Sequence, residues 1–476
     1  MHATRRTDRY RFVFLTVLFP LASISAKPAA VIAALRDKNM NTLRVGIAGL
    51  GTVGMGALKL LASRPDAITH AAGRSITVTA ISSRDRTKDR GVDLSGMEWF
   101  ADPVALAKSP AIDVFVEMIG GDSGVALDAV KAALKAGKHV VTANKALLAK
   151  HGAKLARLAE EKGVSLSFEP AAAGGIPVIK ALRESLAGNR VTRVSGIMNG
   201  TCNYILSRME AEGLTFAECL TDAQRLGYAE ADPTFDVEGF DTAHKLALLT
   251  SLAFGTEVDA EAIYVEGISN VTPLDLKMAD ELGFRIKLLG VAERTALGIE
   301  QRVHPTFVPK TAQLAQVMGV LNAVSVQAEP VGELTFVGPG AGGGATGSAV
   351  VGDIIDIARG RFGPAFGRSS EHLEKLVRAP IRRHEGGYYI RLQVKDKPGA
   401  AATIATRMAE RGISLESILQ KGGRDRLARE GIANGDSVPV VLITYATSEA
   451  HIRDALKKIA SDGVLDGEPQ AIRIER

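Results

Sequence analysis

Residues 43–62, with the sequence LRVGIAGLGTVGMGALKLLA, decide the fold of the first third of the chain. An apolar strand over residues 43–48 is followed by a Gly-x-Gly-x-x-Gly turn and by a helical run from Met55. In this setting Gly49 makes the turn, Gly51 lets the backbone approach a pyrophosphate, and Gly54 lets the helix pack on the strand. The segment therefore predicts a Rossmann-type dinucleotide-binding domain. The expected cofactor contacts in this turn are Gly49, Leu50, Gly51, Thr52, Val53 and Gly54.

The second strand, residues 76–81, ends in the sequence Ser-Ser-Arg-Asp-Arg. An enzyme that uses NAD is expected to place an acidic residue at this strand tip, where it holds the ribose hydroxyls. Here serines and arginines come first, which suits the 2′-phosphate of NADP. We expect Arg84 to contact that phosphate and NADP to be preferred, whereas an inward-pointing Asp85 would restore NAD binding.

A lysine follows a later buried strand of the same domain. The run Lys138-His-Val-Val-Thr-Ala-Asn-Lys145 ends a strand and starts a helix. Ligands of open α/β sheets bind beyond the carboxyl ends of the strands. Lys145 is therefore a candidate site residue, although a surface lysine on the next helix is the commoner arrangement.

The middle of the chain carries a dense acidic stretch, AQRLGYAEADPTFDVEGFDTAHK, over residues 223–245. Pro233 and Gly239 force turns, and a helical run begins near Asp241. Asp241 and Lys245 stand four residues apart, so they share one face of that helix. A carboxylate beside an amine, behind a carboxylate-lined loop, suits binding a small amino acid and moving a proton on it. The alternative is a solvated acidic loop followed by an ordinary surface ion pair.

This stretch resembles the signature of homoserine dehydrogenases. The matching residues are Ala223, Gly227, Tyr228, Asp232, Pro233, Asp236, Gly239, Asp241 and Lys245. The resemblance implies NAD(P)-dependent interconversion of L-homoserine and L-aspartate 4-semialdehyde, a step toward threonine, methionine and isoleucine.

The same resemblance implies roles for individual residues. Lys245 is expected to donate the proton, and Asp241 to orient it or to hold the substrate hydroxyl. Glu230 and Asp236 are expected to bind the substrate, with the Glu230 carboxylate accepting from its ammonium group. The family carries a similar Thr-Ala-Asn-Lys run, so Lys145 is expected to reach both cofactor and substrate. Thr142 and Gly227 are further expected cofactor contacts.

The family also holds a sodium ion near a bend, through one glutamate and backbone carbonyls. The matching positions here are Glu169, Ala172, Gly174 and Ile176. Ala172 stands where relatives often carry valine, and a carbonyl ligand is indifferent to that change.

A glycine-rich loop over residues 338–348 precedes a helix expected over residues 349–359. It reads either as a hinge or, by resemblance to the family, as a turn that returns the chain to the cofactor. In the second reading Gly342 is a backbone contact.

Residues 387–476 predict the element order βαββαβ, a ferredoxin-like unit. The Asp-x-Pro-Gly turn at Asp396 resembles ACT domains, which bind amino acids, so threonine is the expected effector. The alternative is a plain oligomerisation module. The chain is thus an α/β protein, expected as a homodimer or homotetramer. The expected segments are 1–39, an N-terminal extension; 40–170, the Rossmann domain; 171–337, an α+β substrate and dimerisation domain; 338–384, a return helix and linker; and 385–476, the ACT domain.

Amino-acid composition limits the cellular compartments and the classes of binding partner that we expect. A net charge of +5 over 476 residues, without a basic stripe, argues against nucleic acid. Two cysteines, Cys202 and Cys219, fit a reducing compartment. Residues 1–39 have the shape of a secretory signal, too short to span a membrane, or precede a true start at Met40. We favour Met40 and the cytoplasm, because export would separate the protein from its nicotinamide cofactor.

Two rival functions remain open on sequence alone. One is a different dehydrogenase on the same scaffold, dependent on Cys202, although no histidine base stands in a comparable turn. The other is a sensor that binds nicotinamide at its start and an amino acid at its tail. The Glu230, Asp241 and Lys245 set argues against the sensor, which needs no proton donor.

Overall fold

A computed structural model describes residues 42–420 and 437–475. The signal-like segment and the alternative start at Met40 lie outside the described residues. Within these ranges, no helix has the length and apolar character needed to cross a membrane.

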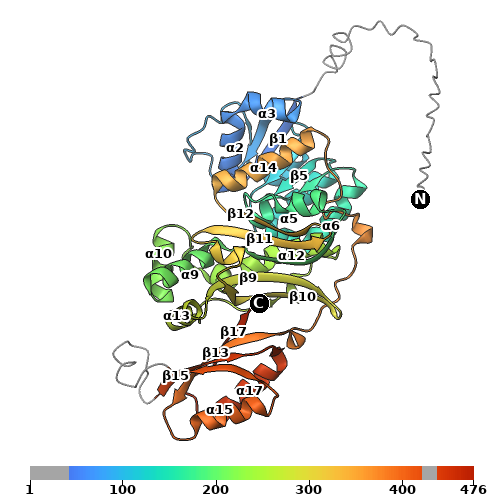
Figure 1. Cartoon of the computed structure of the whole chain (residues 1–476). Coiled ribbons are helices and arrows are strands. Elements are labelled where there is room, and N and C mark those ends of the chain that lie inside the picture. Colours follow the sequence, from blue (N-terminus) through green and yellow to red (C-terminus); the bar gives the residue numbers. More distant parts are fainter. Residues whose placement is uncertain (1–41, 421–436, 476) are drawn as a thin grey trace, which may run out of the picture. The chain divides into compact units, whose positions relative to one another are not determined.

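The first sheet has six parallel strands, in the order β3-β2-β1-β4-β5-β6 (Figure 1). This is the strand order of a dinucleotide-binding fold, whose ligand lies where the order reverses, between β1 and β4. The predicted Rossmann-type domain is confirmed. The strands are β1 (Leu43–Ala48), β2 (Ile76–Ser82), β3 (Glu98–Phe100), β4 (Val114–Glu117), β5 (His139–Thr142) and β6 (Leu166–Ser167). The helices of this part are α2 (Thr52–Ser63), α3 (Pro65–Ala72), α4 (Pro103–Lys108), α5 (Val125–Lys135) and α6 (Lys145–Glu161).

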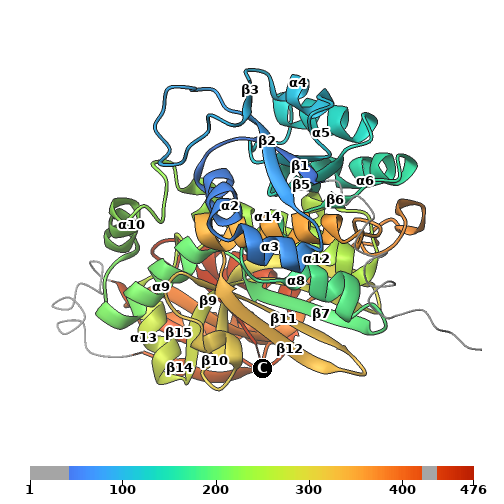
Figure 2. The ribbon, with the colours of Figure 1, turned by 90° about the horizontal axis from the view of Figure 1, so that it is seen from above.

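A helix from late in the chain, α14 (Gly343–Ala358), packs against α2 (Figure 2). It begins six residues before the expected start at Ala349, so the expected glycine-rich loop is shorter than predicted. The reason is close packing. A Cβ on Gly347 would lie 2.7 Å from the Ala57 nitrogen, and one on Gly56 would lie 1.9 Å from the Gly343 oxygen. These glycines serve a helix contact, where sequence alone indicates a flexible turn.

The second sheet contains parallel and antiparallel strand pairs. Strands from the middle of the chain form one end of this sheet, and strands from the tail form the other end. Its strand order is β12-β11-β7-β9-β10-β17-β13-β15-β14. The strands from the middle part are β7 (Arg190–Ile197), β8 (Tyr264–Val265), β9 (Phe284–Thr295), β10 (Gly298–Pro309), β11 (Leu321–Glu329) and β12 (Gly332–Pro339). The helices are α7 (Pro170–Ala173), α8 (Val178–Lys180), α9 (Gly200–Glu212), α10 (Phe216–Arg225), α11 (Thr234–Val237), α12 (Phe240–Phe254) and α13 (Pro273–Glu281). Helix α12 packs on β7 and β9, which fixes the site residues it carries.

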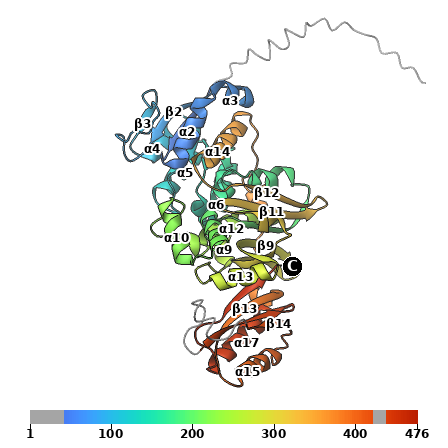
Figure 3. The ribbon, with the colours of Figure 1, turned by 60° about the vertical axis from the view of Figure 1, so that its left-hand side comes forward.

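The tail has the predicted βαββαβ order, with both helices on one side of its strands (Figure 3). Its elements are β13 (Glu385–Lys395), α15 (Ala400–Ala409), β14 (Leu415–Leu419), β15 (Ser437–Thr444), β16 (Thr447–Ser448), α17 (Glu449–Ser461) and β17 (Gln470–Ile474). The strand order β17-β13-β15-β14 is that of a ferredoxin-like unit. β17 also pairs with β10, at Thr306 and Phe307, so the tail extends the second sheet.

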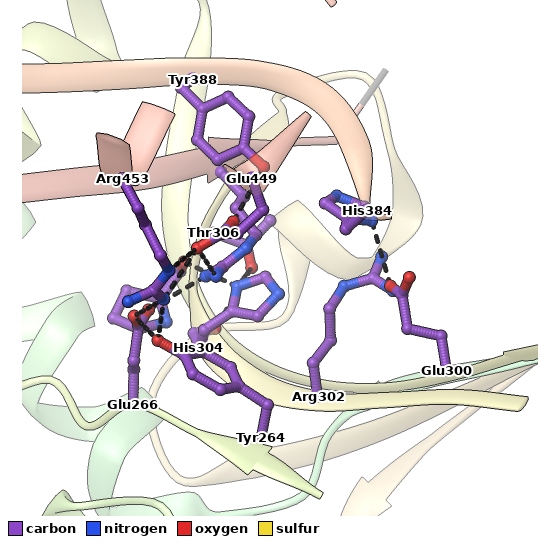
Figure 4. Close-up of polar contacts among 12 residues, drawn as sticks. Tyr264, Glu266, Glu300, Arg302, His304, Thr306, His384, Tyr388, Glu449 and Arg453 are labelled. Atoms are coloured by element: carbon purple, nitrogen blue, oxygen red, sulfur yellow. Dashed lines mark hydrogen bonds and ion pairs between the residues drawn. The ribbon is translucent and has the colours of Figure 1, made fainter. Parts of the chain in front are cut away.

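A cluster of ion pairs with one tyrosine joins the tail to the middle part, and we call it the charged seam: Glu266, Tyr388, Glu449, Arg453 and Arg473. Figure 4 labels all of these except Arg473. Arg473 donates to Glu266 at 3.0 Å and to Glu449 at 2.7 Å. Tyr388 donates to Glu449 at 2.8 Å, and Arg453 pairs with the same carboxylate at 2.7 Å. Arg473 and Glu449 are each 5% exposed, whereas Arg453 lies at the surface, so the Arg473–Glu449 pair is the buried centre of the seam.

Candidate active site

Helix α12 carries the central residues of the candidate site. Gly239 precedes it with φ 87°, a left-handed conformation that favours glycine, and this turn sets where the helix begins. Asp241 lies in the first turn and Lys245 follows one turn later. The predicted pair forms: the Lys245 ammonium lies 2.8 Å from Asp241 Oδ2, and the Asp241 side chain is only 7% exposed. The pair is buried, which distinguishes it from an ordinary surface ion pair.

Asp241 is the hub of a larger polar cluster. Lys145, at the start of α6, lies 3.1 Å from Asp241 Oδ1. Lys245 also donates to the Met198 carbonyl oxygen at 2.7 Å. The two lysines, predicted from separate segments, therefore meet on the two oxygens of one carboxylate.

Asn199 completes this cluster, and sequence reasoning missed it. Its Nδ2 donates to Asp241 at 2.8 Å and to Asp236 at 2.9 Å. Its Oδ1 accepts from the Cys202 nitrogen at 2.8 Å, which caps the start of α9. The Asn-Gly-Thr sequence at the helix start was a signal for the cap, but not for the two carboxylates.

The pKa values of the two aspartates of the cluster, Asp236 and Asp241, are shifted in opposite directions. Burial is the largest single influence on the pKa of Asp241 and raises it. The positive charges of Lys245 and Lys145 together outweigh burial and hold the pKa of Asp241 well below its usual range. Burial raises the pKa of Asp236, and the negative charge of Asp241 adds to that rise. Asp241 therefore stays ionised beside the lysines, whereas Asp236 is the carboxylate that takes up a proton more readily.

A cavity of about 500 Å³ opens on this cluster. Lys145, Lys245, Asp236, Asp241 and Asn199 line it. So do predicted cofactor contacts from three other segments: Val53, Gly227 and Gly342. The cavity therefore brings the dinucleotide turn and the lysine cluster to one space.

The turn after β1 is built for close backbone approach. A Cβ on Gly49 would lie 2.3 Å from the Met118 oxygen, and one on Gly54 would lie 2.0 Å from the Gly49 oxygen. Nothing lies within 4 Å of a Cβ placed on Gly51, which leaves room for a ligand. Leu50 is buried and Thr52 is the first residue of α2. Helix N-termini attract anions, so the turn fits the pyrophosphate predicted there.

Arg84 and Asp85, the two residues expected to decide between NAD and NADP, follow the end of β2 and differ in their surroundings. Arg84 is exposed. Asp85 turns back on its own loop: its Oδ1 accepts from the Thr87 nitrogen and hydroxyl at 2.8 Å and from the Lys88 nitrogen at 3.2 Å. The Asp85 carboxylate is thus engaged locally, which favours the arginine as the residue facing a ligand.

Thr142 lies at the buried end of β5, one step from the cavity. Its hydroxyl donates to Glu117 at 2.6 Å and accepts from the Asn144 nitrogen at 3.0 Å. Asn144 in turn caps α6 by accepting from the Leu147 nitrogen at 3.0 Å. Thr142 therefore supports the turn that aims Lys145, while its predicted contact with the cofactor stays a prediction.

Two residues singled out from the sequence, Glu230 and Cys202, are not placed to act on a ligand in the cavity. Glu230 is exposed and is not among the residues that line the cavity, so its proposed contact with substrate is unsupported by this geometry. Cys202, the rival nucleophile, is fully buried and donates to the Asp236 carbonyl oxygen at 3.2 Å. Burial raises the pKa of the Cys202 thiol well above its usual range, so a nucleophilic thiolate is disfavoured.

The bend predicted to hold sodium is buried. Glu169 accepts from the backbone nitrogens of Ile179 at 3.0 Å and Lys180 at 2.8 Å. Burial, followed by the charge of Asp353, raises the pKa of Glu169 to about 7. Ala172 and Gly174 also line the cavity, and Ile176 is buried just beyond them. Carboxylate and carbonyl oxygens are the donors that a hard cation takes, so these residues fit the predicted ion.

Comparisons with known proteins agree with this arrangement. Residues 49–169 match the NAD-binding domain of homoserine dehydrogenase, residues 177–355 match the homoserine dehydrogenase family, and residues 388–461 match the ACT domain. Homoserine dehydrogenase of Pseudomonas aeruginosa is 45% identical over 92% of this chain and 100% of its own length.

Solved structures give the same result. The homoserine dehydrogenase of Thiobacillus denitrificans superposes with a TM-score of 0.84 at 41% identity, covering 91% of this chain and 98% of its own. A hyperthermophilic archaeal homoserine dehydrogenase, solved in complex with NADPH, has a TM-score of 0.59 at 26% identity, covering 68% of this chain and 99% of its own. On identity, coverage and fold together, this chain belongs to the homoserine dehydrogenase family.

Proposed function

We propose that the chain interconverts L-homoserine and L-aspartate 4-semialdehyde, with Lys245 as the proton donor to the carbonyl oxygen. The observation that carries this assignment is the junction of Lys245, Asp241 and Lys145 in one cavity with Val53 of the dinucleotide turn. The bound nicotinamide dinucleotide supplies the hydride for the aldehyde and accepts it from the alcohol. The protein supplies the proton and holds the substrate.

The two lysines are held for different parts of this task. An ammonium group has three donors, and Lys245 uses two of them on Asp241 and the Met198 oxygen. The third is left for a substrate oxygen. Lys145 is more exposed, at 31% against 12% for Lys245, and is suited to the substrate carboxylate or the same oxygen. Asp241, ionised between them, orients both.

Recognition of the substrate's ammonium group falls to Asp236 in this geometry. Its carboxylate lines the cavity, whereas Glu230 does not. Asn199 fixes Asp236 beside Asp241 through the hydrogen bond at 2.9 Å. Glu230 keeps a role only if its loop closes over the substrate.

NADP is the proposed cofactor, with Arg84 holding the 2′-phosphate. The local hydrogen bonds of Asp85 support this choice, because they occupy the acidic group that NAD would need. The archaeal relative solved with NADPH is a further support. The remaining proposed contacts are Gly49, Leu50, Gly51, Thr52, Val53, Gly54, Thr142, Lys145, Gly227 and Gly342.

The tail is proposed to bind threonine and the bend to hold sodium. A cavity of about 170 Å³ adjoins the Asp396–Gly399 turn and is lined by Lys395, Asp396 and Ile404, a size that suits one small amino acid. Glu169, with the carbonyls of Ala172, Gly174 and Ile176, would hold the ion; the supporting observation is the burial of the Glu169 carboxyl group at this bend. Copies are proposed to pair as a dimer or tetramer, supported by exposed Val337 on the edge strand β12 and exposed Val331 in the turn before it. The two buried free cysteines support a cytoplasmic location.

One assay tests the main proposal. The purified chain is given homoserine with NADP or with NAD, and reduced cofactor is followed by absorbance, with and without threonine. We expect oxidation of homoserine, faster at low cofactor concentration with NADP. Arg84→Ser is expected to weaken NADP binding and spare NAD. Absence of homoserine oxidation with both cofactors would refute the proposed reaction.

A further inference from the structure

Glu117, the last residue of β4, places a buried carboxylate at the carboxyl edge of the first sheet. Its side chain is fully buried. Its Oε1 accepts from the backbone nitrogens of Ile119 at 2.7 Å and Gly120 at 3.0 Å. Its Oε2 accepts from the Thr142 hydroxyl at 2.6 Å. Glu117 therefore ties the turn after β4 to the end of β5.

These hydrogen bonds match the ionised form of Glu117. All three partners are donors, and the Thr142 oxygen itself accepts from the Asn144 nitrogen at 3.0 Å, which leaves its hydroxyl proton for Glu117. A neutral carboxyl group would carry a proton that needs an acceptor of its own. Lys145, which follows the same edge, is paired with Asp241. Among the ion pairs of the described residues, none includes Glu117.

The turn after β4 does not by itself explain a charge at this position. The neutral oxygen of a glutamine could accept from the same two backbone nitrogens. A buried charge without a cationic partner is costly, whereas a neutral amide with hydrogen-bond partners costs much less. The negative charge of Glu117 therefore indicates a role that the hydrogen bonds alone do not fill.

The strand order places Glu117 on the nicotinamide side of the dinucleotide site. The first sheet runs β2-β1-β4-β5 in this region. Arg84, the proposed contact of the 2′-phosphate, follows β2, and Gly51 of the pyrophosphate turn follows β1. The other half of the cofactor must continue in the same direction, across the ends of β4 and β5, to reach Lys145 in the catalytic cavity. Glu117 ends β4 on this course.

The charges that line the cavity do not cancel that of Glu117. Lys145 and Lys245 bring two positive charges, and Asp236 and Asp241 bring two negative charges when both are ionised. The four balance one another. Glu117, outside this set, is then the uncompensated charge near the ring.

We propose that the negative charge of Glu117 makes the protein favour the oxidised cofactor over the reduced one. This inference rests on the proposed function for its cofactor. The nicotinamide ring is positively charged when oxidised and neutral when reduced, so a fixed anion near it stabilises only the oxidised form. Salt screens a buried charge much less than a surface charge. Glu117 thereby makes bound NADPH a stronger hydride donor, which favours reduction of the semialdehyde.

Equilibrium binding without substrate tests this role. The Kd of NADPH is measured by its fluorescence and that of NADP⁺ by displacement of NADPH, and the ratio of the two is compared between variants. Glu117→Gln removes the charge and keeps an acceptor for the turn, so it should weaken NADP⁺ about threefold to tenfold relative to NADPH. Glu161→Gln removes an exposed carboxylate at the end of α6 and is the matched control, which should keep the wild-type ratio.

A second variant separates charge from shape. Glu117→Asp keeps the charge on a shorter side chain, so both Kd values should rise as the turn shifts while their ratio stays close to that of the wild type. Equal losses of NADP⁺ and NADPH binding in Glu117→Gln would overturn the proposal, because they would show a role limited to the turn. So would a ratio that changes as much in Glu117→Asp as in Glu117→Gln.

The same measurements distinguish this role from the proposed reaction. A chain with the expected ratios that does not oxidise homoserine would refute only the reaction. A chain that oxidises homoserine while Glu117→Gln keeps the wild-type ratio would refute only the role of Glu117. A wild type that binds neither nucleotide would refute the proposed cofactor and this role together.

Discussion

The ammonium group of Lys245 lies 2.8 Å from Oδ2 of Asp241, one turn earlier on the same buried helix. This contact fixes the direction of the proposed proton donor. Replacing Lys245 with alanine should lower turnover by about two to four orders of magnitude, the usual contribution of a positioned acid. NADPH binding, measured by fluorescence, should persist. Lys277→Ala, on the exposed face of α13, is the matched control and should retain full turnover.

Asn199 offers a way to separate helix capping from the alignment of the two aspartates. Asn199→Asp can still accept from the Cys202 nitrogen, but it loses the donor that reaches Asp236 and Asp241 and adds a third carboxylate. We expect kcat/KM to fall about 10- to 100-fold, from the loss of hydrogen bonds to charged groups. The acidic limb of the pH–rate profile should move to higher pH, because like charges raise carboxyl pKa values. An unshifted profile would show that Asn199 serves only as a cap.

Glu169 should give the fold a pH dependence that sodium modifies. Its pKa rises from 4.5 to about 7 in the folded chain, so the folded state holds this proton more tightly than the unfolded state. Glu169 therefore contributes stability at low pH that is lost as the pH rises through about 7. Thermal melts of Glu169→Gln should show less loss of stability across this range than the wild type.

The same variant tests the sodium site. At about pH 8, where Glu169 is ionised, replacing sodium with tetramethylammonium should lower the Tm of the wild type and leave Glu169→Gln unchanged. Glu184→Gln, an exposed carboxylate paired with Arg183, should respond to sodium as the wild type does. A sodium effect that survives in Glu169→Gln would place the ion elsewhere.

The charged seam should be sensitive to loss of a single partner. Arg473→Met leaves Glu449 and Glu266 with Arg453 as their remaining guanidinium, so we expect a loss of about 1.5–3 kcal/mol, the usual contribution of hydrogen bonds between charged groups. Denaturant unfolding should show that loss. Arg382→Met removes an exposed pair with Asp454 and should cost about 1 kcal/mol or less. Equal losses in the two variants would mean that the seam adds no stability of its own.

Local sequence rules predicted the parts of the site that depend on neighbours in the chain. The spacing of Asp241 and Lys245 put both on one helical face, and the end of β5 placed Lys145. Asn199 escaped notice because its partners lie 37 and 42 residues away and meet it only after folding. The early start of α14 was missed because its glycines looked like a loop until their contact with α2 was known. Pairing of β17 with β10 joins distant segments and leaves no local pattern.

The hydrogen bonds between β17 and β10 give the tail a structural role in addition to any regulatory one, because β17 covers part of the edge of β10. Thr306 and Phe307 have their ladder partners at Arg473 and Ile474, and the Phe307 oxygen accepts from the Glu475 nitrogen at 2.9 Å. A chain shortened after residue 384 would bare these peptide groups along one border of the sheet. Bare strand borders recruit other strands, so the shortened enzyme would tend to precipitate rather than work as an unregulated catalyst.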